Sequence, residues 1–146
     1  MRRLLLALAT GCLAAAPAAA AAKAPIPGVR TPSGNIRCLY VPGASPTLRC
    51  EIKSSSYGAQ LQARCLRIAT LDWHGFELRP ATKGRVTCSG GILYSPDTQR
   101  PLYRRLAYGA TWSHGGFTCL SALTGLTCHS GRGHGLFLSR DSWRSW

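Results

Sequence analysis

The sequence has few acidic side chains: five aspartates and glutamates stand against eighteen lysines and arginines, giving a formal net charge of +13 at pH 7. Most of the basic residues are arginine, whose planar guanidinium suits carboxylate and phosphate groups. This balance disfavours a strongly basic partner, because like charges oppose association, and it permits an anionic one. The positive residues are scattered along the chain, so solubility and an arginine-rich composition account for the charge slightly better than a dedicated anion site.

No two cysteines have the short spacing, two to four residues apart, that is typical of structural zinc sites. The sequence therefore predicts no metal site, and it contains no pattern that calls for a cofactor. One of the seven cysteines, Cys12, lies in the N-terminal leader, and an even number in the rest of a small exported chain indicates disulfides. The remaining cysteines are Cys38, Cys50, Cys65, Cys88, Cys119 and Cys128.

Beyond the N-terminus, the sequence lacks an apolar run of the roughly 20 residues that a membrane-spanning helix needs. The N-terminus itself carries Arg2 and Arg3, then an apolar stretch, then small alanine-rich residues, which is the pattern of a cleaved signal peptide. We therefore expect a signal peptide over residues 1–22 and a single disulfide-linked domain over residues 23–146, secreted or otherwise extracytoplasmic. In an alternative, Cys12 follows Gly11 as the lipid-bearing cysteine of a lipoprotein.

The six cysteines of the domain share a local pattern, in which an apolar residue and then a polar residue precede the cysteine. This alternation is typical of a half-buried strand, with the cysteine and its apolar neighbour on one face. The sequence thus predicts a small all-β domain of antiparallel hairpins, either a curled sheet or a sandwich, cross-linked by three disulfides. Residues 57–69, which include Cys65, are the one segment suited to a short helix.

Cys38 and Cys50 can be opposed in a hairpin whose connection, residues 42–46, is rich in proline and glycine. Opposed positions on antiparallel strands have the Cβ separation that a disulfide needs. This register also places apolar side chains together on the face that carries the cysteines. The apolar pairs are Ile36 with Ile52 and Tyr40 with Leu48.

The same reasoning opposes Cys119 and Cys128 across residues 122–125, where Gly125 can adopt the positive φ that such turns often require. Cys65 and Cys88 are then paired by elimination among the fifteen connectivities that six cysteines allow. A further hairpin is expected between residues 76–80 and 84–88. Its register would oppose Leu78 with Val86 and Phe76 with Cys88.

Five segments together resemble a family of small exported bacterial proteins that is catalogued as a domain of unknown function. They are TPSGNIRC (31–38), LRCEI (48–52), LAYG (106–109), GGFTCLSALTGLTC (115–128) and GHGLFLSRDSW (133–143). The resemblance spans residues 30–143 and implies an exported, disulfide-linked domain without assigning an activity. The sequence departs from the family pattern at Leu136, where that pattern has phenylalanine, and at Gly90-Gly91, where it has an acidic stretch.

The segment GRGHG, residues 131–135, offers the strongest local signal for a site. Backbone N–H groups of its glycines could converge on an anion beside Arg132, and His134 and Arg140 are the other candidate anion-binding residues. A metal site is disfavoured, because Cys128 is expected in a disulfide and no carboxylate is near. The simpler interpretation, which we favour, is a glycine-rich connection between two strands, with the imidazole of His134 supporting the loop.

Two classes of function agree with these features. The first is a non-enzymatic binding module with a basic surface, whose partner is an anionic cell-envelope polymer or another protein. The second is a small secreted basic hydrolase, nuclease-like, which would need a histidine and a glutamate brought together near a cation. No catalytic motif and no specific nucleic-acid-binding motif is present, so the sequence favours the binding module and assigns no catalytic residue.

Overall fold

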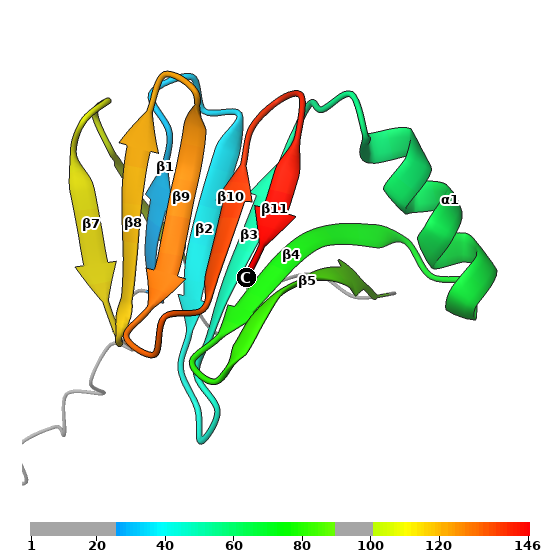
Figure 1. Ribbon diagram of the computed structural model, residues 1–146, viewed down its shortest axis with the longest axis horizontal. Coiled ribbons are helices and arrows are strands. Elements are labelled where there is room, and N and C mark those ends of the chain that lie inside the picture. The colour runs from blue at the N-terminus through cyan, green and yellow to red at the C-terminus, as the bar shows by residue number, and fades with distance from the viewer. Residues whose placement is uncertain (1–25, 90–100) are drawn as a thin grey trace, which may run out of the picture.

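The computed structural model describes residues 26–89 and 101–146, which form two β-sheets and one helix (Figure 1). One sheet has the strand order β5-β4-β3-β2-β1-β6, and the other has the order β11-β10-β9-β8-β7. The elements are β1 (Ile26–Arg30), β2 (Ile36–Val41), β3 (Thr47–Ile52), α1 (Gly58–Ala69), β4 (Trp73–Arg79), β5 (Thr82–Cys88), β6 (Pro101–Arg105), β7 (Thr111–His114), β8 (Phe117–Ala122), β9 (Gly125–Ser130), β10 (Gly135–Leu138) and β11 (Trp143–Ser145).

This architecture confirms the predicted all-β domain with one short helix. The expected signal peptide, Cys12 and the Gly90-Gly91 departure lie outside the described residues. Among the described residues, no helix is long and apolar enough to cross a membrane.

The two hairpins derived from cysteine alternation have the predicted registers. In β2–β3, Cys38 lies opposite Cys50, and the pairs Ile36–Ile52 and Tyr40–Leu48 flank them. In β8–β9, Cys119 lies opposite Cys128, and Ala122 opposes Gly125 across a two-residue turn. Gly125 has a φ of +148°, and a Cβ there would overlap the carbonyl oxygen of Leu138.

All three disulfides of the structure are the predicted ones: Cys38–Cys50, Cys65–Cys88 and Cys119–Cys128. Two of them meet in the middle of the core, because the sulfurs of Cys38, Cys50 and Cys128 lie within 4.8 Å of one another. The two sheets therefore pack face to face as a sandwich, with each sheet contributing a hairpin disulfide. Other fully buried side chains between the sheets are Val29, Leu48, Phe76, Leu78, Phe117, Leu126, Leu136 and Leu138.

The structure confirms the short helix expected over residues 57–69 and corrects the strand position that the alternation before Cys65 indicated. Cys65 lies in α1, where it and Leu61, together with the N-cap residue Tyr57, follow one another at four-residue intervals and are all buried. A four-residue interval places side chains on one face of a helix, so this face packs inward. The disulfide to Cys88 then joins the helix to β5.

The predicted register of the β4–β5 hairpin is also wrong. Phe76 lies opposite Val86 and not Cys88, so the predicted pairing of Leu78 with Val86 does not form. The register shifts on both sides of Phe76-Glu77. Gly75 causes part of this irregularity: its φ is +92°, and a Cβ there would overlap the carbonyl oxygen of Cys50. A bulge of this kind inserts extra residues into one strand, which alternation alone does not reveal.

Several strand pairings have no counterpart in the sequence prediction, among them two at sheet edges. β1 and β6 pair in parallel, with Arg30 beside Arg105, although they are far apart in the sequence. β11 pairs with β10 at the other sheet's edge, with Leu138 opposite Trp143. Because β1, β3 and β6 run in the same direction, their carboxyl ends meet at one end of the sandwich.

Candidate functional site

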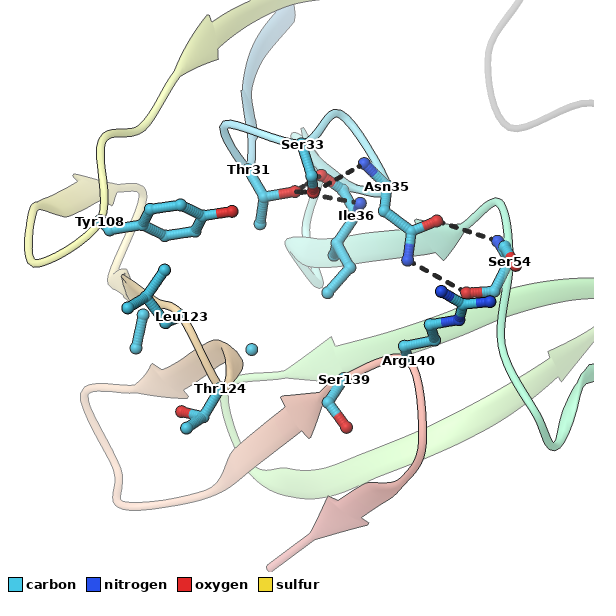
Figure 2. Close-up of a pocket in the computed structure, with 12 residues that line it drawn as sticks. Thr31, Ser33, Asn35, Ile36, Ser54, Tyr108, Leu123, Thr124, Ser139 and Arg140 are labelled. Carbon is cyan, nitrogen blue, oxygen red and sulfur yellow. Dashed lines mark hydrogen bonds between the residues drawn. The ribbon is translucent and has the colours of Figure 1, made fainter.

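Turns from both sheets gather at the end of the sandwich that is uppermost in Figure 1. They are the β1–β2 turn (31–35), the β8–β9 turn (122–125) and the β10–β11 turn (139–142), joined by the segments before α1 and before β7. An open pocket of about 370 Å³ lies among them, and we call it the end pocket (Figure 2). Its hydroxyl- and amide-bearing side chains are Thr31, Ser33, Asn35, Ser54, Tyr108, Thr124 and Ser139.

The β1–β2 turn is held by one of its own side chains. The Oγ1 of Thr31 accepts from the N–H of Ile36 at 3.2 Å and donates to the Ile36 carbonyl at 3.3 Å, and the Thr31 N–H donates to the same carbonyl. Thr31 is 4% exposed, so these buried polar groups satisfy one another. The turn presents Ser33 and Asn35 to the pocket in a defined conformation.

Asn35 then fixes this turn to the segment that leads into α1. Its Nδ2 donates to the Ser54 carbonyl at 3.0 Å, and its Oδ1 accepts from the Ser54 N–H at 3.0 Å (Figure 2). The Lys53 N–H donates to the Asn35 carbonyl at 2.9 Å. An asparagine side chain has both a donor and an acceptor, and here both bind the backbone of one residue, Ser54.

The opposite wall of the pocket is the β10–β11 turn. The Ser139 Oγ accepts from the N–H groups of Ser142 at 3.0 Å and Asp141 at 3.3 Å, which closes the turn. The Ser56 N–H donates to the Arg140 carbonyl at 2.9 Å and ties this turn to the other sheet's loop. The backbone of Arg140 is thus held while its side chain is exposed and lines the pocket.

Tyr57 adds a second link across the same junction. Its hydroxyl donates to the Ser139 carbonyl at 3.0 Å. Burial raises the pKa of Tyr57 to about 12. The hydroxyl is therefore protonated, as a donor must be, throughout the physiological range.

Arg140 is the one charged side chain in the lining of the end pocket, and no carboxylate is part of that lining. Tyr108, 44% exposed, forms one side, and Figure 2 shows its hydroxyl pointing toward Thr31. Leu123, 85% exposed, stands at the β8–β9 turn. The lining can hydrogen-bond hydroxyl groups of a ligand and can pair one anionic group with a guanidinium.

The structure separates the three predicted anion-binding residues. Arg132 and His134 lie in the β9–β10 turn, at the end of the sandwich opposite the end pocket, whereas Arg140 follows β10 at the pocket end (Figure 1). In the β9–β10 turn, the Ser130 N–H donates to the His134 carbonyl at 2.8 Å and the Gly133 N–H to the Ser130 carbonyl at 3.1 Å. GRGHG therefore forms a tight connection in which the backbone carbonyl of His134 supports the loop.

The two glutamates, which a hydrolase of this kind would use as acid–base groups, are engaged by arginines. A smaller pocket of about 160 Å³ brings His74 near Glu51, but Glu51 is ion-paired with Arg37 at 2.6 Å. Glu77, 4% exposed, is ion-paired with Arg79 and Arg85. These are the chain's two glutamates, and both are held by arginines in the described structure.

The one group of potential metal ligands found among the described residues is the core sulfur cluster of Cys38, Cys50 and Cys128. Each of these sulfurs is bound in a disulfide. Metals bind thiolates, so these cysteines offer no ligand set while oxidised. They are structural residues of the core.

Sequence reasoning did not identify the end pocket, although its residues come from segments that were singled out. TPSGNIRC contributes Thr31, Ser33 and Asn35, LAYG contributes Tyr108, and the last two motifs contribute the β8–β9 turn and Arg140. The polar loop residues of these motifs, rather than the glycines of residues 131–135, were the available signal. Only the pairing of strands far apart in sequence brings them together.

Comparisons of the chain with protein-family models, with curated proteins and with solved structures found no significant match. The function is therefore inferred from the end pocket and its surroundings.

Proposed function

We propose that the protein is an exported, non-enzymatic binding module that holds an anionic cell-envelope polymer at the end pocket. The observation that carries this proposal is the pocket's lining, in which hydroxyl and amide groups surround a single guanidinium, Arg140, without a carboxylate. Hydroxyl and amide groups pair with the hydroxyl groups of sugars or polyols. The guanidinium pairs with a phosphate or carboxylate through two parallel hydrogen bonds.

The compartment supports this choice of partner. Three disulfides fit an extracytoplasmic protein, because such bonds persist where the surroundings are oxidising. The expected signal peptide over residues 1–22 would deliver the domain to the cell envelope, and in the alternative case a lipid on Cys12 would hold it at the membrane surface. The chain's formal charge of +13, of which Arg2 and Arg3 in the expected leader contribute two, then favours association with anionic envelope material.

The rigidity of the pocket's walls also supports binding. Thr31, Asn35, Ser56, Tyr57 and Ser139 each hold a wall segment through hydrogen bonds to backbone groups. A site whose loops are already ordered loses less conformational entropy when a ligand binds. The hydrolase alternative has less support, because Glu51 and Glu77 are bound to arginines and neither lines the end pocket.

The test compares two arginines at opposite ends of the sandwich. Arg140→Gln should weaken binding of poly(glycerol phosphate) by about threefold to tenfold, which corresponds to the loss of one exposed charge-assisted contact. Arg132→Gln removes the same charge at the β9–β10 turn and should change binding little. Isothermal titration calorimetry on the exported protein with intact disulfides gives both affinities.

Equal effects of the two substitutions would contradict the proposal, because binding would then follow total charge and not the end pocket. Cleavage of the polymer during the titration would also contradict it, in favour of the hydrolase alternative.

A further inference from the structure

Two further depressions adjoin the β1–β2 turn beside the end pocket. One, of about 270 Å³, has Arg30, Gly34 and Lys53 in its lining. The other, of about 350 Å³, is lined in part by Pro32 and Arg105. Successive residues of the β1–β2 turn thus face different depressions, and the turn forms a ridge among them.

The three depressions have neighbouring or shared walls. Tyr108 lines both the end pocket and the depression at Arg105. Ser54 lines the end pocket, and the preceding residue, Lys53, lines the depression at Arg30. One extended ligand could therefore pass from one depression to the next along the same end of the sandwich.

These depressions are uniformly cationic. Each contains at least one of Arg30, Lys53, Arg105 and Arg140, which we call the cationic rim, and no carboxylate is part of any of the three linings. All four side chains are exposed, and none is ion-paired with a carboxylate within the described ranges. Arg37, which lines the same depression as Arg30 and Lys53, is excluded from the rim because it is paired with Glu51.

The rim is wider than a single anion. Lys53 follows β3, and Arg30 and Arg105 end β1 and β6, in a sheet whose order here is β3-β2-β1-β6. Neighbouring strands are about 4.8 Å apart, so the backbone positions of Lys53 and Arg105 are separated by on the order of 14 Å. Lys53 and Arg105 also line different depressions, so consecutive units of a polymer can engage both, each in its own depression.

We infer that the cationic rim is a track for a linear polyanion, whose successive charged groups engage Arg30, Lys53, Arg105 and Arg140 together. The inference rests on the proposed function and specifies its ligand: a chain of hydroxyl-bearing units with an anionic group at regular intervals. The hydroxyl and amide groups of the end pocket contact the units between the charges. A phosphodiester-linked polyol and a uronic acid glycan share this chemistry.

Binding through several weak contacts makes affinity depend on the length of the ligand. When one charged group is bound, the next is held at a high effective concentration beside its own cation. Each pairing also releases small ions, so the affinity of a longer chain falls more steeply as salt concentration rises. A site for one monomer would show neither behaviour.

The experiment is a chain-length series on the exported protein, using glycerol 3-phosphate, a short oligomer and an oligomer of about twelve glycerol phosphate units. Affinities are measured by calorimetry at low and at near-physiological salt. The long oligomer should bind at least about tenfold more tightly than the monomer, and with a steeper salt dependence. Oligogalacturonate of matched length, tested in parallel, should show the same length dependence.

Variants separate the rim from the end pocket. Removing one rim cation at a time should weaken binding of the long oligomer by about twofold to fivefold and leave the affinity for the monomer nearly unchanged. The variants are Arg30→Gln, Lys53→Gln and Arg105→Gln. Arg140→Gln should weaken binding of both the monomer and the long oligomer. Arg132→Gln, at the opposite end, is the matched control for charge and should leave the affinity for both ligands unchanged. Circular dichroism verifies that each variant is folded.

Equal affinity for monomer and oligomer, with sensitivity to Arg140→Gln alone, would overturn the track and leave the proposed function intact. No binding of any ligand in the series would overturn both. Single-stranded DNA of the same charge binding as tightly as the glycerol phosphate oligomer would also refute the track, because the units between the charges would then contribute nothing.

Discussion

Tyr57 joins two parts of the fold through one hydroxyl group, which donates to the carbonyl of Ser139. Its pKa of about 12, raised by burial, exceeds the value near 10 of an unfolded tyrosine. Below pH 10 the hydroxyl is protonated in both states, and its contribution to stability is fully present. As the pH rises from 10 toward 12, the unfolded chain ionises first, so the folded state loses stability.

Tyr57→Phe should remove this alkaline loss. The free energy of unfolding of the unmodified protein should fall by about 1 kcal/mol from this residue alone between pH 9 and pH 11. At pH 9 the free energy of unfolding of the variant should be lower by about 1 kcal/mol, because one hydrogen bond is missing. Its further fall between pH 9 and pH 11 should be smaller by the contribution of Tyr57. Guanidinium denaturation at the two pH values measures both quantities, and parallel declines would contradict the assignment.

Asn35 shows at the same scale why a residue's type underdetermines its role. In the sequence it belongs to a polar turn before the first core cysteine, and asparagine is common in turns. In the structure its amide bridges the β1–β2 turn to Ser54 through two hydrogen bonds and forms a wall of the end pocket. The partner lies nineteen residues away, so local sequence does not contain this information.

At the scale of elements, α1 depends on its disulfide. The helix has no side-chain N-cap and no acidic residue in its first turn, and its outward residues include Leu66 and Ile68, 48% and 65% exposed. A helix of twelve residues is marginal in isolation, so its stability comes from its buried face and from covalent attachment. Cys65–Cys88 provides that attachment.

Replacing Cys65 and Cys88 together by alanine should lower stability by about 3 kcal/mol, the chain-entropy value for a loop of this length. The loss should be uneven: amide hydrogen exchange should rise most in α1 and least in the β8–β9 hairpin, which retains Cys119–Cys128. Hydrogen-exchange mass spectrometry resolves the two regions. Uniform acceleration across both would show that the disulfide stabilises the domain as a whole and not the helix.

The hairpins mark the limit of prediction at this scale. The β2–β3 and β8–β9 registers followed from alternation, because a cysteine pair and its apolar neighbours must share one face. The β4–β5 register did not follow, because Gly75 and the shift after Glu77 change the count of residues along the strand. Alternation predicts a register only where each residue of one strand opposes one residue of its partner.

At the scale of the whole molecule, the dominant feature is unbalanced positive charge. The described ion pairs involve only Glu51 and Glu77, while the chain has eighteen lysines and arginines. Most cations therefore repel one another without a compensating carboxylate. Self-repulsion of this kind disfavours the compact state, and salt screens it.

Raising sodium chloride from about 10 mM to about 200 mM should increase the Tm by roughly 2–5 °C, because the Debye length falls from roughly 30 Å to below 10 Å. Differential scanning calorimetry at constant pH measures the change. A falling Tm would mean that attractive surface pairs outweigh repulsion.

The sequence by itself determined the β class, the disulfide-rich character and two of the hairpins. These properties depend on alternation and turn residues within segments of fewer than about twenty residues, where local geometry is decisive. Tertiary structure alone decided the sandwich, the parallel β1–β6 pairing and the end pocket. Arg140 and Asn35 line the same pocket, whereas Arg132 lies at the opposite end, because strand order and direction decide which turns share an end. Strand order and direction in turn depend on contacts between segments that are distant in the sequence.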